Sequence, residues 1–378
     1  MKHQKKLLII EELILFDLFL YYDETEQKIL DESFFADRII MLPRFRPHQL
    51  ERAVRLSVDY CQNKVFKQKL LEKSIECPVM IFRLYKRGFF VFEEIEPCLR
   101  DRNSYLFCYY FRQEINHFES FIQNKRIPND FEDEFLESPG HLEQLIEFGF
   151  LPSSIEYCLK YDDIDVLRDM TISNEKCAKW SLFEWSCKPK YLDLLSFSGY
   201  FGSIKCFKQL ILNKYEISNE VISMVVCSGC FDLFHLCQRS QIYTKESLFV
   251  AVEYCQLHLL AFMIENGADI NIKNDNSSTL LHYSAEYCHL SIIKFLIAKG
   301  VNINAKTKNG LTPLHFAALN GNLRVVEYLV NHGADIHAKD EYDFTPLHFS
   351  AQSDHFAVVE FFVNHGADLN AQTSNIDK

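Results

Sequence analysis

Cys227-Ser228-Gly229-Cys230 is the motif whose spacing most suggests chemistry, and His235 and Cys237 follow it closely. Such a group can supply tetrahedral zinc ligands. A Cys-x-x-Cys pair at the start of a helix that follows a strand can instead exchange disulfides. Here the motif falls where a turn between two packed helices is expected, and other cysteines of the chain fill small apolar positions. Packing is therefore the favoured interpretation, with zinc and redox sites as the alternatives, and we expect no bound metal.

Two cysteine–histidine neighbours, Cys255 with His258 and Cys288 with His289, could pair a nucleophile with its base. A third orienting residue and a nucleophile motif normally accompany such a pair, and neither recurs here. The sequence also has no glycine-rich phosphate loop, and no acid pair stands out from the general acidity. We therefore predict neither catalysis nor a cofactor. An enzyme in the N-terminal half stays a remote alternative, which would need clustered polar residues.

His282, His315 and His348 recur at intervals of 33 residues. A repeated histidine suggests either a metal or catalytic site, or a structural role. One histidine per repeat places the rings about a repeat-width apart, too far to share an ion. The favoured interpretation is a ring that hydrogen-bonds backbone groups between adjacent repeats.

These histidines belong to three segments that align without gaps at a period of 33 residues, the first starting at Thr279. In the central segment, Thr312 suits a helix N-cap and Pro313 the first helical position, where no N–H is needed. Asn320-Gly321 predicts a turn into a second, more apolar helix, which Gly333 ends in a left-handed conformation. An extended hairpin then leads to the next unit. One unit cannot bury its apolar faces alone, so the units must stack.

The Thr-Pro-Leu-His motifs at Thr312 and Thr345 and the Gly-Ala-Asp motifs at Gly333 and Gly366 resemble the ankyrin repeat. The resemblance implies an all-α fold, an ankyrin-type helical solenoid with an irregular helical N-terminal region. We expect a divergent helical region over 1–180 and degenerate ankyrin-like helix pairs over 181–245. Ankyrin repeats are expected over 246–378, with units near 246–278, 279–311, 312–344 and 345–378.

Weaker copies of the unit lie upstream. Segments beginning at Gly202 and Gly229 resemble the turn and second helix of a repeat at a shorter spacing. Gly88-Phe89-Phe90 and Gly149-Phe150-Leu151 are fainter echoes, 61 residues apart. The stretch from Trp185 to Ile217 also looks like the divergent domain of unknown function that precedes ankyrin repeats in protein families of parasitic protozoa. This second resemblance implies no activity.

Composition narrows the classes of partner and compartment. The 378 residues carry a net charge of −12, which disfavours nucleic-acid binding. Thirteen cysteines without framework spacing indicate reduced thiols and a cytoplasmic location. Acidic residues interrupt the apolar run at Leu7 to Ile10, which predicts an amphipathic helix rather than a signal peptide or membrane span. The one basic stretch is spaced like the solvated face of a helix: Lys64, Lys67, Lys69 and Lys73.

The ankyrin resemblance implies a scaffold that binds another protein on the concave face made by hairpin tips and first helices. Tyr342 and Phe344 are the preferred anchors, because exposed aromatic residues often carry interface energy. The identity of the partner is not encoded in such a surface. The implied contact positions flank the hairpin turns and the ends of the first helices: Asn276, Ser278, Glu286, Tyr287, Lys308, Asn309, Leu311, Leu319, Asn320, Glu341, Tyr342, Phe344, Gln352 and Ser353.

The unit that starts at Thr345 keeps the apolar second helix of an internal repeat, including Phe361 and Phe362. A terminal repeat is expected to have a polar outer face. We therefore expect an open apolar face at this end, with Phe361 the more exposed of the two phenylalanines. Such a face supports either self-association through the C-terminal repeat, the alternative to partner binding, or membership of a longer array.

Overall fold

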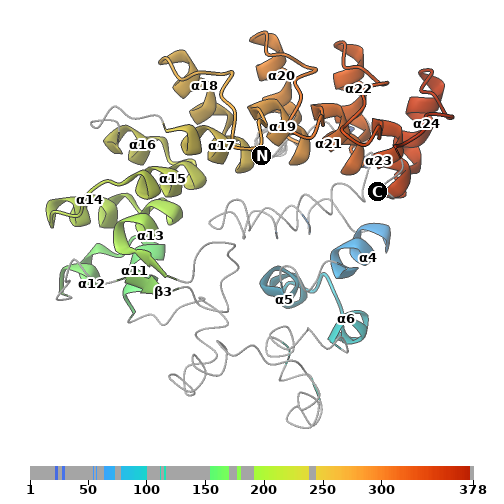
Figure 1. The fold of residues 1–378 in the computed structure, drawn as a ribbon. Coiled ribbons are helices and arrows are strands. Elements are labelled where there is room, and N and C mark those ends of the chain that lie inside the picture. The colour runs from blue at the N-terminus through green and yellow to red at the C-terminus, as the bar shows by residue number, and fades with distance from the viewer. Residues whose placement is uncertain are drawn as a thin grey trace. The chain divides into compact units, whose positions relative to one another are not determined.

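The chain divides into two compact units, Met1–Ser240 and Gln241–Lys378, and the computed structural model describes both as mostly helical (Figure 1). In the part of the chain that it describes, no helix is long and apolar enough to cross a membrane. The predicted N-terminal amphipathic helix, the motif at Gly149 and residues 185–190 lie outside that part. The described residues are 22–23, 28–29, 54, 57, 64–72, 78–99, 111, 115, 154–169, 177–179, 191–237 and 244–374.

Helix α13 (Leu194–Phe201) is the centre of the described part of the first unit, and all eight of its residues are buried. Asp193 caps this helix by accepting a hydrogen bond from the Ser196 amide at 2.8 Å. Gly199 allows close packing, because a Cβ there would lie 2.9 Å from the Val225 side chain. The described helices of the first unit are α4 (Lys64–Glu72), α5 (Pro78–Lys86), α6 (Phe92–Leu99), α11 (Ile155–Tyr161), α12 (Ile164–Asp169), α13, α14 (Ile204–Leu212), α15 (Asn219–Ser228) and α16 (Phe231–Cys237).

Two short antiparallel strand pairs also occur in this unit, which the all-α expectation did not include. β3 (Cys177–Lys179) pairs with β4 (Tyr191–Asp193), and β4 leads directly into α13. β1 (Tyr22–Asp23) pairs with β2 (Lys28–Ile29). Helices pack as consecutive pairs, α11 with α12, α13 with α14 and α15 with α16. The predicted helical, repeat-type fold is therefore confirmed.

Four helix pairs form the second unit, with the first helices in one row and the second helices in another (Figure 1). Each first helix packs on its own second helix, and successive first helices pack on one another. The apolar positions of the 33-residue pattern form the core, so that Leu314, Val325 and Leu329 are buried. The pairs are α17 (Lys245–Glu253) with α18 (Leu257–Glu265), α19 (Leu280–Glu286) with α20 (Leu290–Ala298), α21 (Pro313–Leu319) with α22 (Leu323–Asn331), and α23 (Pro346–Gln352) with α24 (Phe356–Asn364).

The helix ends in this unit are where the sequence predicts them. Thr312 is the N-cap of α21 in an extended conformation, and Pro313 is its first residue. Gly333 follows the last turn of α22 at φ 96°, the left-handed conformation predicted for it. Local residue choice therefore fixes where each helix begins and ends.

The turn between the two helices of each pair contains one residue in the left-handed conformation. Gly321 has φ 70°, and Cys255, Cys288 and Asp354 have φ values between 54° and 59° at the same place in their repeats. The sequence predicts that cysteines outside the Cys-x-x-Cys motif fill small apolar positions, and for Cys255 and Cys288 this prediction is incomplete. They occupy the turn position where glycine is the least strained residue.

We predict that Gly321→Ala lowers the free energy of unfolding by about 2 kcal/mol, as measured by urea denaturation. An alanine there keeps the left-handed backbone, and its Cβ would clash with the imidazole ring of His355. His355 would then lose the hydrogen bond from its Nε2 to the Leu319 carbonyl, now 2.9 Å long. Gly333→Ala is the matched control, because Gly333 also has a positive φ but its Cβ would meet nothing within 4 Å. Equal losses for the two variants would contradict the predicted contact with His355.

Candidate interaction face of the repeats

The hairpin loops between repeats end in tight tips that side chains hold in shape. The Asp340 carboxylate accepts hydrogen bonds from the amides of Tyr342 and Phe344, at 2.9 and 2.8 Å. Asn274 holds the equivalent tip two repeats earlier, where its side-chain oxygen accepts hydrogen bonds of 2.9 Å from the amides of Asn276 and Ser278. Thr307 accepts from the Leu311 amide at 3.1 Å in the tip between them. These three residues were not singled out from the sequence, although Asn, Asp and Thr at the start of a turn are a recognisable signal.

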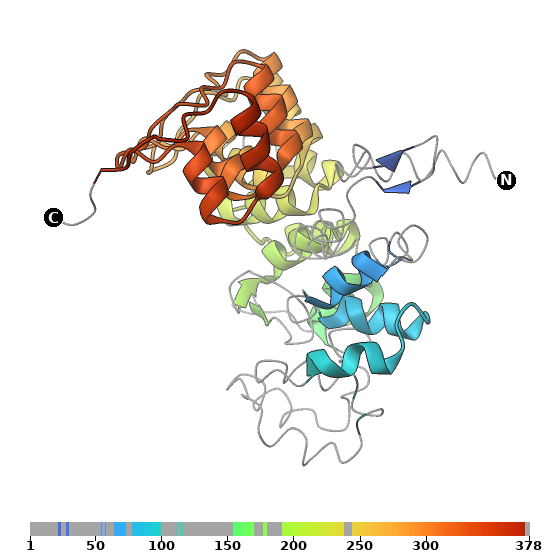
Figure 2. The ribbon, with the colours of Figure 1, turned by 90° about the vertical axis from the view of Figure 1, so that its right-hand side faces the viewer.

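Neighbouring tips are joined by backbone hydrogen bonds. The Lys308 amide donates to the Asn276 carbonyl, and the Glu341 amide donates to the Asn309 carbonyl, both at 2.9 Å. The loops consequently stack to one side of the helices (Figure 2). The sequence predicts extended hairpins between the repeats, but the structure has tight turns there. Outside the named strands, the described residues contain one isolated β-bridge, between Lys273 and Thr279. A stacked row of tips presents their side chains in a fixed order.

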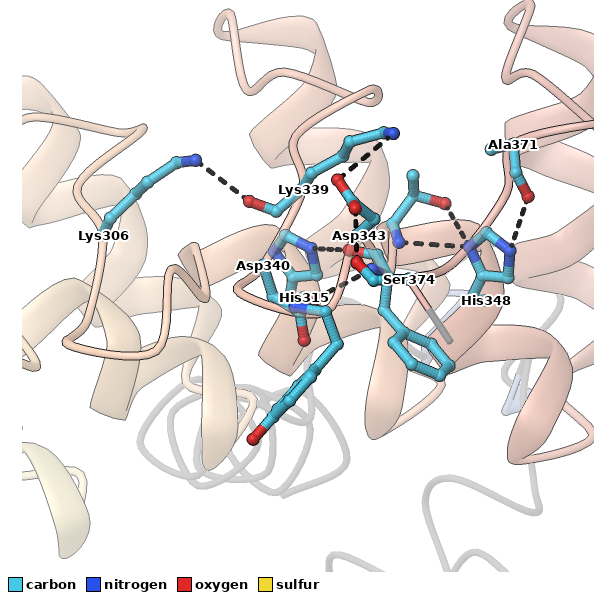
Figure 3. Close-up of polar contacts among 11 residues, drawn as sticks. Lys306, His315, Lys339, Asp340, Asp343, His348, Ala371 and Ser374 are labelled. Carbon is cyan, nitrogen blue, oxygen red and sulfur yellow. Dashed lines mark hydrogen bonds and ion pairs between the residues drawn. The ribbon is translucent and has the colours of Figure 1, made fainter. Parts of the chain in front are cut away.

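The last tip is tied down further by polar contacts, drawn in Figure 3. Ser374 donates to the Asp343 carboxylate at 2.5 Å, and Lys339 lies 3.4 Å from the same carboxylate. These contacts hold the pKa of Asp343 below its ordinary value. Lys306 donates to the Lys339 carbonyl at 3.0 Å, which links two successive loops.

The recurring histidines connect adjacent repeats, as predicted. The Thr312 amide donates to Nδ1 of His315 at 3.0 Å. Because Nδ1 is an acceptor, Nε2 carries the proton and donates to the Phe344 carbonyl of the next loop at 3.1 Å. His282 makes the same contacts one repeat earlier. Burial lowers the pKa of both His282 and His315 to about 4, so both rings are neutral at physiological pH.

A second set of links joins the ends of the first helices, and the sequence did not reveal it. His289 and His355 donate from Nε2 to the carbonyls of Glu253 and Leu319, at 3.1 and 2.9 Å. In the repeat between them, the Asn320 side chain donates to the Glu286 carbonyl at 2.9 Å. In the sequence, these links are marked only by a polar residue in the turn that precedes each of these second helices. Together the two sets of links hold the first helices and the tips as one framework.

The predicted contact residues differ in how accessible they are. Tyr342 and Leu319 are the large apolar ones among them that are clearly exposed, at 50% and 41% of their surface. Ser278 is buried, with 7% of its surface exposed, so its side chain offers almost no contact surface to a partner. Four others are half-buried, namely Tyr287, Leu311, Phe344 and Ser353. The remaining exposed positions are Asn276, Glu286, Lys308, Asn309, Asn320, Glu341 and Gln352.

The two preferred anchors have different environments. The ring of Phe344 packs edge-on against His348 and Phe349, with ring centroids 5.6 and 6.1 Å apart. Part of the Phe344 side chain is therefore buried in contacts within the repeats. Tyr342 projects from the same tip, two residues before Phe344, and is half exposed. Of the two, Tyr342 has the more accessible ring.

The Cys-x-x-Cys motif lies in the turn where the sequence places it. Cys227 is buried near the end of α15, and Gly229 caps that helix at φ 69°. Burial raises the pKa of Cys237 to about 12, which keeps its thiol protonated and a poor metal ligand or nucleophile. No group of three or more potential metal ligands occurs among the described residues. That the protein holds no zinc stays a prediction.

In the basic stretch near residue 64, Lys67 makes an ion pair and two cation–π contacts. Lys67 lies 3.7 Å from Glu94 and its ammonium is over the rings of Phe89 and Phe90, 5.0 and 5.5 Å from the centroids. These contacts occupy it within the first unit. Lys73 lies outside the described residues.

The geometry is that of a helical-repeat protein with a prearranged face of first helices and tips. Residues 195–307, 248–340 and 281–373 each match the family model described as ankyrin repeats (3 copies). Residues 195–373 are accordingly ankyrin repeats, a class that commonly binds proteins and is typically non-catalytic. The match begins upstream of the four regular units, and no family is assigned to the N-terminal region. No curated protein matches the chain.

Proposed function

We propose that this chain is a scaffold that binds a partner protein through the first-helix face, meaning the hairpin tips and the exposed residues of α17, α19, α21 and α23, and that it does so without catalysis. The observation that supports this most is the joint exposure of Tyr342 and Leu319 on a framework tied together by hydrogen bonds. A prearranged surface loses little conformational entropy on binding. Exposed aromatic and apolar residues on such a surface are typical interface anchors.

The test compares capture of partner proteins from the native cell by the full chain and by three variants. Tyr342→Ala and Leu319→Asp are expected to reduce the captured partner at least tenfold, a loss typical of an interface anchor. Tyr328→Ala is the matched control, because Tyr328 is an aromatic residue of a second helix, outside the proposed face. A partner that all four proteins capture equally would exclude this face as its binding site.

Self-association through the C-terminal repeat is a second candidate. Phe361 is half-buried and stacks on His365, with the ring centroids 3.9 Å apart, whereas Phe362 is completely buried, so Phe361 is the more exposed of the two, as predicted. Phe356 is exposed over 77% of its surface, and Val363 and Leu369 are also exposed. Exposed apolar residues that lie together favour association. Gel filtration of the full chain separates a self-associating protein from a monomeric scaffold.

We also propose a cytoplasmic location. The odd number of cysteines and the absence of framework spacing among them in the sequence support it, because cytosolic thiols stay reduced. The separate resemblance of residues 185–217 to a domain of unknown function, and the boundaries at 180 and 245, stay predictions.

A further inference from the structure

The last residue of each first helix in the second unit occupies the same position of the repeat. These four residues, which we call the helix-end row, are Glu253, Glu286, Leu319 and Gln352. Two successive repeats thus present a carboxylate, the third an apolar side chain and the fourth an amide. The row belongs to the first-helix face, and three of its members are exposed: Glu286, Leu319 and Gln352.

Glu286 lies where a carboxylate does not stabilise the fold. It is the final residue of α19, next to the partial negative charge of a helix C-terminus. Although Glu286 is exposed, the protein around its carboxylate removes part of the water that would solvate it; this partial desolvation and the nearby charge of Glu253 raise its pKa. None of the ion pairs between described residues of the second unit includes Glu286. Neither the helix dipole nor an ion pair of the described residues therefore accounts for an acid at this position.

The apolar part of the row is continuous with aromatic surface. Leu319 follows α21's Phe316, which is half-buried against His282 of the preceding repeat at a centroid distance of 5.8 Å. Phe349 packs in the same way on His315, at 5.4 Å. A chain lying along the row would therefore meet carboxylates at α17 and α19, the apolar Leu319 at α21, and the amide of Gln352 at α23.

We propose that the helix-end row recognises a protein segment that places lysine or arginine against Glu286 and Glu253, and an apolar side chain against Leu319. This inference rests on the proposed function and specifies the chemistry of its partner. A cationic side chain would relieve the repulsion between the two carboxylates and the helix C-terminus, which gives the bound state an advantage absent in the free protein. A metal ion is the poorer occupant, because the described residues here offer no third ligand. Nucleic acid would be repelled by the same charges.

The test uses random 12-residue peptides displayed on phage and selected on the full chain. Recovered sequences are expected to combine lysine or arginine with leucine or an aromatic residue. One recovered peptide is then synthesised, and its Kd is measured for wild type, Glu286→Gln, Leu319→Asp and Glu360→Gln. We expect Glu286→Gln to weaken binding about fivefold to tenfold at low salt and to reduce its salt dependence. Glu360→Gln makes the same chemical change on the exposed part of a second helix and is expected to leave Kd unchanged.

Thermal unfolding separates lost binding from lost folding. Because Glu286→Gln removes a repulsive charge, its Tm should equal or exceed that of wild type. Peptides that lose affinity for Leu319→Asp but bind Glu286→Gln normally would leave the proposed function intact and overturn the cationic partner. Peptides that bind both variants normally would place the binding site elsewhere and contradict both proposals. Recovery of acidic peptides would also overturn the inference.

Discussion

Replacing Leu329 with alanine is expected to lower the free energy of unfolding of the second unit by about 2–5 kcal/mol. Leu329 is completely buried in α22. Its removal deletes apolar contacts and leaves a cavity, because the stacked repeats on either side cannot fully collapse into the space. Urea denaturation of the full chain, followed by circular dichroism, measures the loss.

The control for this substitution is Leu319→Ala. It removes the same atoms from the neighbouring helix, where the leucine is 41% exposed, and should cost no more than about 1 kcal/mol. A loss below about 0.5 kcal/mol for Leu329→Ala would show that this leucine does not lie in the stack between repeats.

Acid is expected to destabilise the repeats between pH 6.5 and about 4, through His282 and His315. Folding lowers the pKa of each ring from 6.5 to about 4 by burying it. Within this window the unfolded chain binds protons that the folded chain does not, so stability falls as the pH falls. Above pH 6.5 the two rings are neutral in both the folded and the unfolded chain, and below about pH 4 they are protonated in both. Their contribution to stability therefore changes only between these limits. Each histidine is expected to cost on the order of 3 kcal/mol by pH 4 relative to pH 7.

The hydrogen bonds of His315 explain why the folded protein disfavours the protonated, positively charged form of the ring. Nδ1 of His315 accepts from the Thr312 amide, and a proton on Nδ1 would remove that acceptor and leave the amide without it. Among nearby charges, Asp340 raises the pKa of His315 and Lys306 lowers it, and burial outweighs both. The folded protein therefore binds this proton only near and below pH 4.

The measurement is the free energy of unfolding as a function of pH for wild type, His315→Gln and His337→Gln. Protonation of carboxylates contributes equally to the pH dependence of all three proteins. The difference between the wild-type and variant curves therefore reports the histidine that was replaced. His315→Gln should lose stability at pH 7 but show a shallower decline from pH 6.5 to 4, by about one proton. His337 is exposed, and its replacement should leave the slope unchanged. A slope that His315→Gln does not alter would refute the assignment of the proton to this ring.

The regular repeats were largely predictable from sequence because their determinants are local. Thr312, Pro313 and Gly333 act through the backbone groups of their own helix ends, and each behaves as its residue type predicts. The 33-residue period sets which side chains must face the core, so Leu314 and Leu329 are buried as expected. The structural role of His282 and His315 followed from their spacing alone.

The interaction face was decided only by the tertiary structure, because burial at its positions depends on what the neighbouring repeat places beside them. Tyr342 and Phe344 lie two residues apart on one tip, yet only the first keeps an open ring, since His348 and Phe349 cover the second. The sequence determined the repeats and their stacking order. The fold alone decided that Glu286 lies close enough to Glu253 for the charge of one to raise the pKa of the other, because two residues 33 positions apart interact only when their helices pack side by side.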